Sequence, residues 1–166
     1  MQIYFLDEDP VVAARYLPDR LVGKMAVESL QLLSTAHHIL GLPIPVKKDG
    51  TPYKAVKQAK ELVYWLCSSW GNRAWLIHHA LACTQEHTKR YGTVHTCNKV
   101  LQEMVIEEKG DVTPFPRRWM KGAPIEVLND IEQVVEAYRV YLRWKVQEKP
   151  NVFTWKDRRP LWLDHY

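Results

Sequence analysis

The sequence predicts a mainly α protein: one helical domain over residues 1–166, built as a bundle of about six helices. Apolar residues recur at intervals of three and four along several segments, which is the period of a helix that packs on one face. Capping residues, glycines and prolines bound those segments. The sequence lacks the alternating strands and helices that would build a parallel sheet.

The first elements follow from the residues at their ends. Residues 2–6 are apolar and aromatic, and predict a short strand or an extended arm packed on the helices. Asp9 before Pro10 is typical of a helix N-cap with proline in the first turn, so we expect a short helix over 11–16. A long helix over 19–40 follows, because its apolar residues keep the helical period and a glycine and a proline end it.

The later elements are predicted from the same signals. The last helix is the clearest, because Ile125, Leu128 and Ile131 continue the helical spacing as far as Leu142. In chain order we expect a loop at 42–54, helices at about 55–67, 73–91, 96–108 and 125–147, a turn at 68–72, a basic loop at 109–124, and an irregular C-terminal arm at 149–166.

Composition and charge limit the class of protein. The chain is 46% hydrophobic and 25% charged, with a net charge of +4, which is mildly basic and compatible with nucleic-acid binding. Its longest apolar runs fall far short of the roughly 20 residues that span a bilayer, so we expect no membrane association. Three cysteines without a Cys-x-x-Cys pair, and no basic region before the first apolar residues, predict reduced thiols and a cytoplasmic location.

Metal and cofactor sites are not expected. His79, Cys83 and His87 recur at every fourth residue, but three ligands along two helical turns are spread over about 12 Å and cannot converge on one ion. The sequence has no phosphate loop, no dinucleotide-binding fingerprint and no nucleophile elbow. These absences exclude the common nucleoside-triphosphate hydrolases, Rossmann enzymes and α/β-hydrolases.

Two polar stripes on helices give the candidate site. The first stripe is on the 19–40 helix: Asp19 precedes Arg20, Lys24, Glu28 and Gln31, which steps of three and four residues place on one helix face. The second stripe follows the 73–91 helix, at Asn72, Glu86, Arg90, Tyr91 and His95. If the stripes face each other they enclose a charged pocket. If they face water they are ordinary surface pairs, worth about a few tenths of a kcal/mol each.

Arginine alternates with tryptophan towards the C-terminus. These residues predict DNA binding, because phosphates attract guanidinium groups and an unpaired base stacks on tryptophan. The alternative is that the tryptophans fill the core and the arginines are only exposed. The candidates are Arg117, Arg118 and Trp119 in the basic loop, and Arg158 and Arg159 in the C-terminal arm.

Several segments carry a resemblance that covers nearly the whole chain. They are Phe5-Leu6-Asp7, Lys24-Met25-x-x-Glu28-x-x-Gln31, Asn72-x-x-Trp75-Leu76, Glu86-x-x-x-Arg90-Tyr91-Gly92-x-x-His95, and Tyr138-Arg139-x-Tyr141 with Lys145. Together they resemble small helical bacteriophage proteins associated with thymine hypermodification, and the helical domain of 5-hydroxymethyluracil DNA kinases. A looser likeness extends to pyrimidine-dimer DNA glycosylases. These relatives carry a His-Pro pair where this chain has Lys60-Glu61, which puts the chemistry in doubt.

The resemblance implies an enzyme that acts on a modified thymine in DNA, inside an infected bacterial cell and beside other phage enzymes such as a kinase. The base would be flipped into the pocket. Arg20, Lys24 and Arg90 would neutralise a departing phosphate. The catalytic residues would be Lys24, Glu28, Glu86 and His95, and the substrate-binding residues Asp19, Arg20, Gln31, Asn72, Trp75, Arg90 and Tyr91.

Two other functions stay open. In a DNA glycosylase or lyase, Lys24 or the N-terminal amine would attack the sugar, although pairing with Glu28 keeps Lys24 protonated and unreactive. In a non-catalytic DNA-binding or host-interaction module, the pocket would be a structural relic. The replaced His-Pro pair favours this last alternative.

Overall fold

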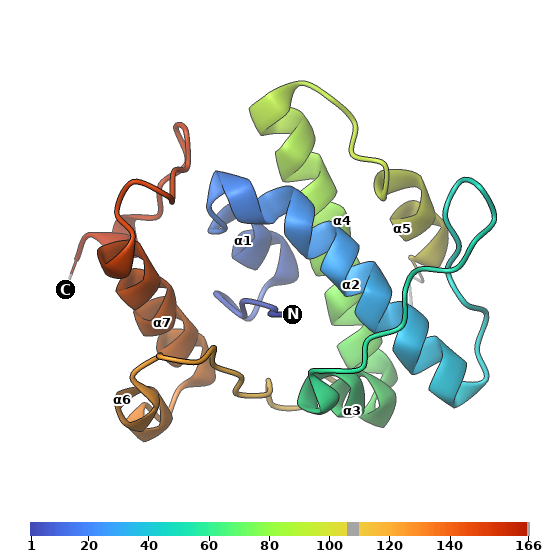
Figure 1. The fold of residues 1–166 in the computed structure, drawn as a ribbon, viewed down its shortest axis with the longest axis horizontal. Helices are drawn as coiled ribbons and strands as arrows, with labels where there is room; N and C mark the ends of the chain where they lie inside the picture. Colours follow the sequence, from blue (N-terminus) through green and yellow to red (C-terminus); the bar gives the residue numbers. More distant parts are fainter. Residues whose placement is uncertain (106–109, 166) are drawn as a thin grey trace.

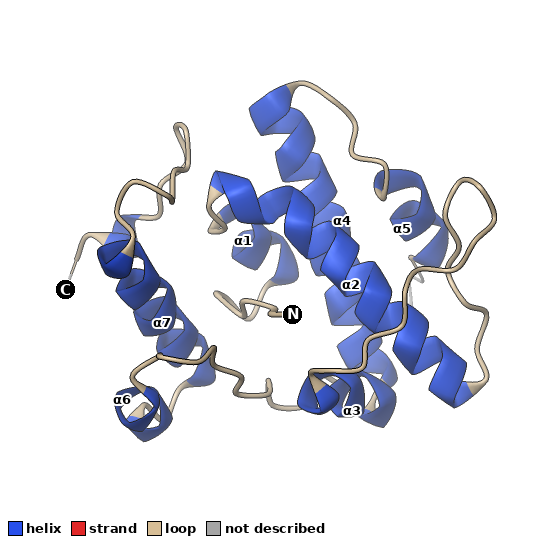
Figure 2. Ribbon diagram, viewed as in Figure 1, coloured by secondary structure: helices blue, strands red, loops and turns tan. Residues whose placement is uncertain are grey.

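The computed structural model describes residues 1–105 and 110–165 (Figure 1). Within these ranges the chain is helical and has no strand, only an isolated bridge between Val46 and Pro52 (Figure 2). The predicted mainly α class is therefore confirmed. The helices are α1 (Pro10–Arg15), α2 (Asp19–Leu40), α3 (Lys60–Ser68), α4 (Trp70–Tyr91), α5 (Asn98–Met104), α6 (Ile125–Asp130), α7 (Val134–Glu148) and a 3₁₀ turn (Leu161–Leu163).

The long helices α2 and α4 pack on each other and form the centre of the larger part of the molecule (Figure 1). Helices α1, α3 and α5 pack around them, and α6 packs on α7. None of the helices in the described ranges is long and apolar enough to cross a membrane. The arrangement places α6 and α7 apart from the other helices, with the N-terminal segment between α7 and the larger part (Figure 1).

The N-terminal segment is an extended, fully buried arm. Ile3, Phe5 and Leu6 have no exposed surface, because α7 covers the arm on one side and α3 and α4 on the other. The Phe5 ring lies 5.1 Å from that of Trp75 and 5.3 Å from that of Tyr138, measured between centroids. Aromatic pairs at these distances contribute about 0.5–1.5 kcal/mol beyond their buried area. The arm therefore joins the two parts of the molecule.

Helix ends agree with the predicted caps in the first half of the chain. The Asp9 carboxylate accepts hydrogen bonds from the backbone N–H groups of Val11 and Val12, at 2.8 and 3.1 Å. Gly41 and Gly92 end α2 and α4 with positive φ angles of 67° and 74°, which glycine adopts without steric cost.

The predicted start of the third helix was wrong. The helix begins at Lys60 because Ala59 adopts a left-handed conformation with φ of 63°, which ends the extended segment before it. That segment runs along α2, where the N–H of Val56 donates to the Thr35 hydroxyl at 2.9 Å. The predicted turn at 68–72 shrinks to Ser69, whose hydroxyl caps α4 by accepting from the N–H of Gly71.

The predicted helix over 125–147 is in fact two helices, α6 and α7, separated at residues 131–133. Arg117 stabilises this break from a distant loop. Its guanidinium donates to the backbone carbonyls of Leu128, Ile131 and Glu132 at 2.9, 2.6 and 2.8 Å. These bonds satisfy carbonyls near the break, where helix ends otherwise leave acceptors without partners. The predicted helix over 96–108 is shorter as well, because α5 ends at Met104, while 106–109 lie outside the described residues.

A close backbone contact fixes the segment after residue 110. A Cβ added to Gly71 would lie 2.1 Å from the carbonyl oxygen of Asp111, so only glycine fits there. The neighbouring Asn72 side chain holds the same segment by two hydrogen bonds, donating to the Thr113 hydroxyl at 2.8 Å and accepting from its N–H at 2.9 Å. This contact directs Phe115 into the aromatic core, where its ring stacks on Phe5 at 4.4 Å.

Candidate functional site

The two polar stripes meet at the start of α2, in a buried ionic cluster. The Arg90 guanidinium contacts the carboxylates of Asp19 at 3.1 Å and Glu86 at 3.2 Å. It also donates to the backbone carbonyls of Leu17 at 2.7 Å and Arg15 at 3.0 Å. Counted with both bonds to Glu86, five hydrogen bonds match the five N–H donors of an arginine. Arg90 therefore has no donor left for a phosphate.

The same cluster holds the C-terminal arm. The second carboxylate oxygen of Asp19 accepts from the Thr154 hydroxyl at 2.8 Å, and the Asp19 N–H donates to the Thr154 carbonyl at 2.7 Å. Glu86 is contacted in addition by Arg158 at 3.4 Å and Lys89 at 3.6 Å. Buried charges that are fully paired in this way fix a conformation. The cluster thus fastens α1, α2, α4 and the C-terminal arm together.

The remaining residues of the second stripe are dispersed over the molecule. Asn72 lies at the other end of α4 from Arg90 and bonds to Thr113. Trp75 belongs to the aromatic core, and its indole N–H donates to the Glu8 carbonyl at 2.7 Å. Tyr91 is exposed, with the Lys156 ammonium over its ring.

His95 lies beside α2. An added Cβ at Gly23 would approach its Nε2 to 3.3 Å. Burial lowers the pKa of His95, and the neighbouring His87 lowers it further. The His95 ring and the Arg90 cluster therefore occupy separate places along α2.

The rest of the first stripe faces α7 and the N-terminal arm. Helical residues are about 100° apart, so Arg20 and Lys24 point away from the face that carries Asp19. The Lys24 ammonium lies 3.5 Å from the Glu28 carboxylate, with 59% of the lysine side chain but only 12% of the glutamate exposed. The other Glu28 oxygen accepts from the N–H of Gln2 at 3.2 Å. Gln31 lies further along, beside residues 54–58.

A cationic pocket lies on this face, with a cavity volume of about 320 Å³. Its walls come from α2, α7, the N-terminal arm, the segment around residue 120 and the start of the C-terminal arm. We call it the α2–α7 pocket. Its lining side chains carry one acid, Glu148, against five bases: Arg20, Lys24, Lys121, Lys145 and Lys149.

Aromatic side chains form the other walls of the α2–α7 pocket. They are Tyr4, Trp144 and Phe153, and the Arg20 guanidinium lies 5.7 Å from the centre of the Phe153 ring. The Lys145 ammonium donates to the Tyr4 hydroxyl at 3.0 Å. Burial is the main cause that raises the pKa of Tyr4, and the charges of Tyr141 and Glu28 add to it. Positive charge beside flat rings suits a ligand that combines an anion with an aromatic ring.

Sequence reasoning did not place Lys121, Lys145, Lys149 or Tyr4 in the site. One signal for two of them was present: Lys145, in the last turn of α7, and Lys149, at its C-cap, are four residues apart, so two like charges lie near the end of this helix. An anionic ligand bound between two such lysines would offset their repulsion.

The predicted DNA-binding residues all make contacts within the chain. Arg117 caps α6, and Arg118 pairs with Glu61 and donates to the Met1 carbonyl. Trp119 packs on Tyr138 and donates to Asn129. Arg158 contacts Glu86, and Arg159 pairs with Asp164 at 2.7 Å.

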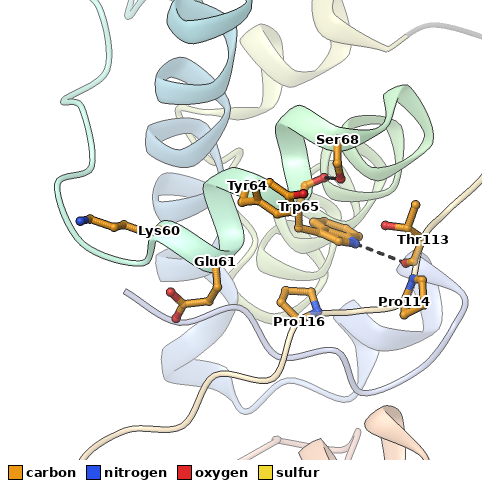
Figure 3. A pocket seen from close by; sticks show the side chains of 8 residues that line it. All are labelled: Lys60, Glu61, Tyr64, Trp65, Ser68, Thr113, Pro114 and Pro116. Carbon is orange, nitrogen blue, oxygen red and sulfur yellow. Dashed lines mark hydrogen bonds between the residues drawn. The ribbon is translucent and has the colours of Figure 1, made fainter.

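A second pocket, of about 410 Å³, lies between α3 and residues 113–116 (Figure 3). Lys60 and Glu61, which stand at the position of the relatives' His-Pro pair, are at its edge, and Figure 3 shows Lys60 directed away from the Trp65 indole. The indole N–H of Trp65 donates to the Thr113 carbonyl at 3.3 Å. The walls are mainly apolar, so this pocket lacks the charge that a nucleotide phosphate requires.

Comparisons of the chain with protein-family models, with curated proteins and with solved structures gave no match. The resemblance to phage thymine-modification proteins stays a prediction.

Proposed function

We propose that the protein acts on a modified thymine of the 5-hydroxymethyluracil class in DNA, as a phage-type hypermodification transferase, and that the α2–α7 pocket receives the flipped base. The observation that supports this function is the pocket itself. It joins Arg20 and Lys24 of the first stripe to three further lysines, Lys121, Lys145 and Lys149, and to three aromatic walls. Its volume of about 320 Å³ lies within the range of small-molecule sites.

The proposed reaction is a substitution at the 5-methylene carbon of the base. An incoming amine forms a bond to this carbon, and the bond from carbon to the phosphate oxygen breaks, with its electron pair leaving on the phosphate. Arg20, Lys24 and Lys149 neutralise the departing anion. Glu28, whose carboxylate lies 3.5 Å from the Lys24 ammonium, takes the proton that the amine loses. The activating phosphate would come from a partner kinase.

In this proposal Arg90 and Glu86 support the site without touching the substrate. Their hydrogen bonds are used inside the ionic cluster, which holds the C-terminal arm and so the Phe153 wall of the pocket. Replacing them would affect activity through stability.

The test is mass spectrometry of nucleosides from DNA incubated with the protein and a mixture of amines. DNA that carries phosphorylated 5-hydroxymethyluracil is compared with ordinary DNA. We expect a new nucleoside mass from the modified DNA alone, and its loss in Arg20→Ala and Glu28→Gln. Lys48→Met, in the loop after α2, is the matched control and should retain activity.

No new mass from the modified DNA, together with equal affinity for both DNAs, would contradict the transferase. It would leave the non-catalytic DNA-binding module as the better description.

A further inference from the structure

Lys145 has a different environment from the other lysines of the α2–α7 pocket. Its Nζ contacts two neutral atoms, the Tyr4 hydroxyl oxygen at 3.0 Å and the Met120 sulfur at 3.2 Å. Within residues 1–105 and 110–165, no carboxylate forms an ion pair with it. Lys24, across the pocket, pairs with Glu28. The two amines share a cavity and differ in their partners.

The neighbours of Lys145 disfavour its protonated form. Burial is the main cause that lowers the pKa of Lys145, and the charges of Lys24, Lys149 and Arg20 lower it further. Desolvation and nearby cations are the two effects by which proteins convert a lysine into a nucleophile. Glu148 is the acid on the pocket wall, and it is exposed on the last turn of α7.

We infer that Lys145 is a nucleophilic amine that condenses with an aldehyde carried beside a phosphate. A small phosphorylated aldehyde and the ring-opened sugar of an abasic site in DNA share this chemistry. Arg20, Lys24 and Lys149 provide the charges that hold the phosphate. The inference goes beyond the proposed transferase and depends on it only in using the same pocket.

The condensation needs no further reactant. The lone pair of Nζ adds to the carbonyl carbon, and the carbonyl oxygen leaves as water with the two protons that the nitrogen gives up. The product is an imine between Lys145 and the former carbonyl carbon. The Tyr4 hydroxyl oxygen, 3.0 Å from Nζ, accepts a hydrogen bond from the amine and so holds Nζ in position for the addition.

The first experiment uses pyridoxal 5′-phosphate as a probe of known chemistry. Borohydride then delivers a hydride to the imine carbon and leaves a stable secondary amine, which peptide mapping locates. We expect Lys145 to be labelled severalfold faster than Lys24, because burial and the neighbouring cations lower the pKa of Lys145 and it has no carboxylate partner, whereas Lys24 is paired with Glu28. Inorganic phosphate should slow the labelling.

Matched variants separate reactivity from folding. Lys145→Arg keeps the positive charge and should lose the label at this position, with an unchanged circular dichroism spectrum. Lys48→Arg, in the loop after α2 and outside the pocket, should leave the labelling of Lys145 intact. Labelling spread over the exposed lysines, without enrichment at Lys145, would overturn the inference.

The second experiment identifies the source of the aldehyde. An oligonucleotide with one abasic site is mixed with the protein and borohydride, and a covalent adduct is sought by gel electrophoresis. An adduct that Lys145→Arg abolishes supports the inference and assigns it to DNA. Labelling of Lys145 by pyridoxal 5′-phosphate alone supports it and assigns a small phosphorylated aldehyde.

Failure of both probes at Lys145 refutes the inference but not the transferase, which is measured by nucleoside mass alone. If the nucleoside product is missing but Lys145 is trapped, the transferase is contradicted and the inference on Lys145 stands.

Discussion

Arg90 shows how a charged side chain can be essential to a fold without reaching a ligand. Its guanidinium is enclosed by the end of α1, the start of α2 and its own helix α4, and each of its N–H groups has a partner. Removing one member of a buried ionic group leaves the others charged and without compensation. Without Arg90, the carboxylates of Asp19 and Glu86 would remain buried without their guanidinium partner.

Arg90→Met should therefore lower the free energy of unfolding by about 3–5 kcal/mol, measured by urea denaturation. Arg20→Met, which removes an exposed guanidinium from the neighbouring helix, should change it by less than about 0.5 kcal/mol. Equal effects of the two substitutions would show that the cluster contributes no more than surface charge.

His79 gives a pH dependence to stability. Its ring is fully buried and stacks on Trp75 with centroids 5.0 Å apart, and burial lowers its pKa from 6.5 to about 3. Between pH 6.5 and about 3, His79 therefore binds a proton in the unfolded chain but not in the folded chain. The stabilisation is complete above pH 6.5 and is lost progressively as the pH falls below it.

Between pH 7 and pH 5 the protein should lose about 2 kcal/mol more unfolding free energy than His79→Leu loses, measured by urea denaturation at both values. His38→Leu, on the exposed last turn of α2, is the control and should follow the unsubstituted protein. Parallel pH profiles for all three proteins would show that His79 is not held neutral.

At the residue scale, the sequence predicted which charged side chains pair, but not whether each pair is buried. The pairing of Lys24 with Glu28 follows from a spacing of four residues, and the structure has it at 3.5 Å. The same spacing in Glu86 and Arg90 gives a buried pair. Spacing shows which side chains share a face, but what covers that face is decided by residues far away in the chain.

At the scale of elements, the boundary between α6 and α7 depends on a side chain from outside both helices. The apolar period continues through residues 131–133, so local sequence favours one helix. Arg117 donates to one carbonyl of α6, that of Leu128, and to two in the break, those of Ile131 and Glu132. The spacing of apolar residues depends only on neighbouring positions. It therefore cannot show that a side chain from a distant loop caps a helix.

Arg117→Met should destabilise the protein by about 1.5–3 kcal/mol, because the carbonyls at the break lose a charged donor. Urea denaturation measures the change, and Lys121→Met, an exposed cation of the same loop, should cost less than about 0.5 kcal/mol. If Arg117→Met is as stable as the control, residues 131–133 are held apart by other contacts.

At the scale of the whole molecule, the α2–α7 pocket lies where two helical parts meet across the N-terminal arm. The sequence predicted the helices and the arm, and it placed Arg20 and Lys24 on one face. It paired this face with α4, whereas the structure pairs it with α7, because the second stripe is used in the ionic cluster. Which helices become neighbours depends on the packing of Phe5 between them, and no spacing along the chain encodes it.

The positive charge of the pocket should appear in the salt dependence of DNA binding. Each cation that contacts a phosphate contributes about 0.9 to the slope of log affinity against log salt concentration for duplex DNA, and about 0.7 for single strands. Lys149→Ala should reduce the slope by about this amount, measured by fluorescence anisotropy, whereas Lys48→Ala should leave it unchanged. Equal slopes for the two variants would show that Lys149 does not contact a DNA phosphate.

The α2–α7 pocket combines Tyr4 and Arg20 with Lys145, which comes much later in the chain, and this order has a consequence for biosynthesis. The first two emerge from the ribosome early, but the α7 wall is translated only after α5, α6 and the loop between them. During that interval Phe5 can pack on Trp65 and Trp75 but not on Tyr138, so one side of its ring stays uncovered. Ligand capture is therefore postponed until α7 has been translated.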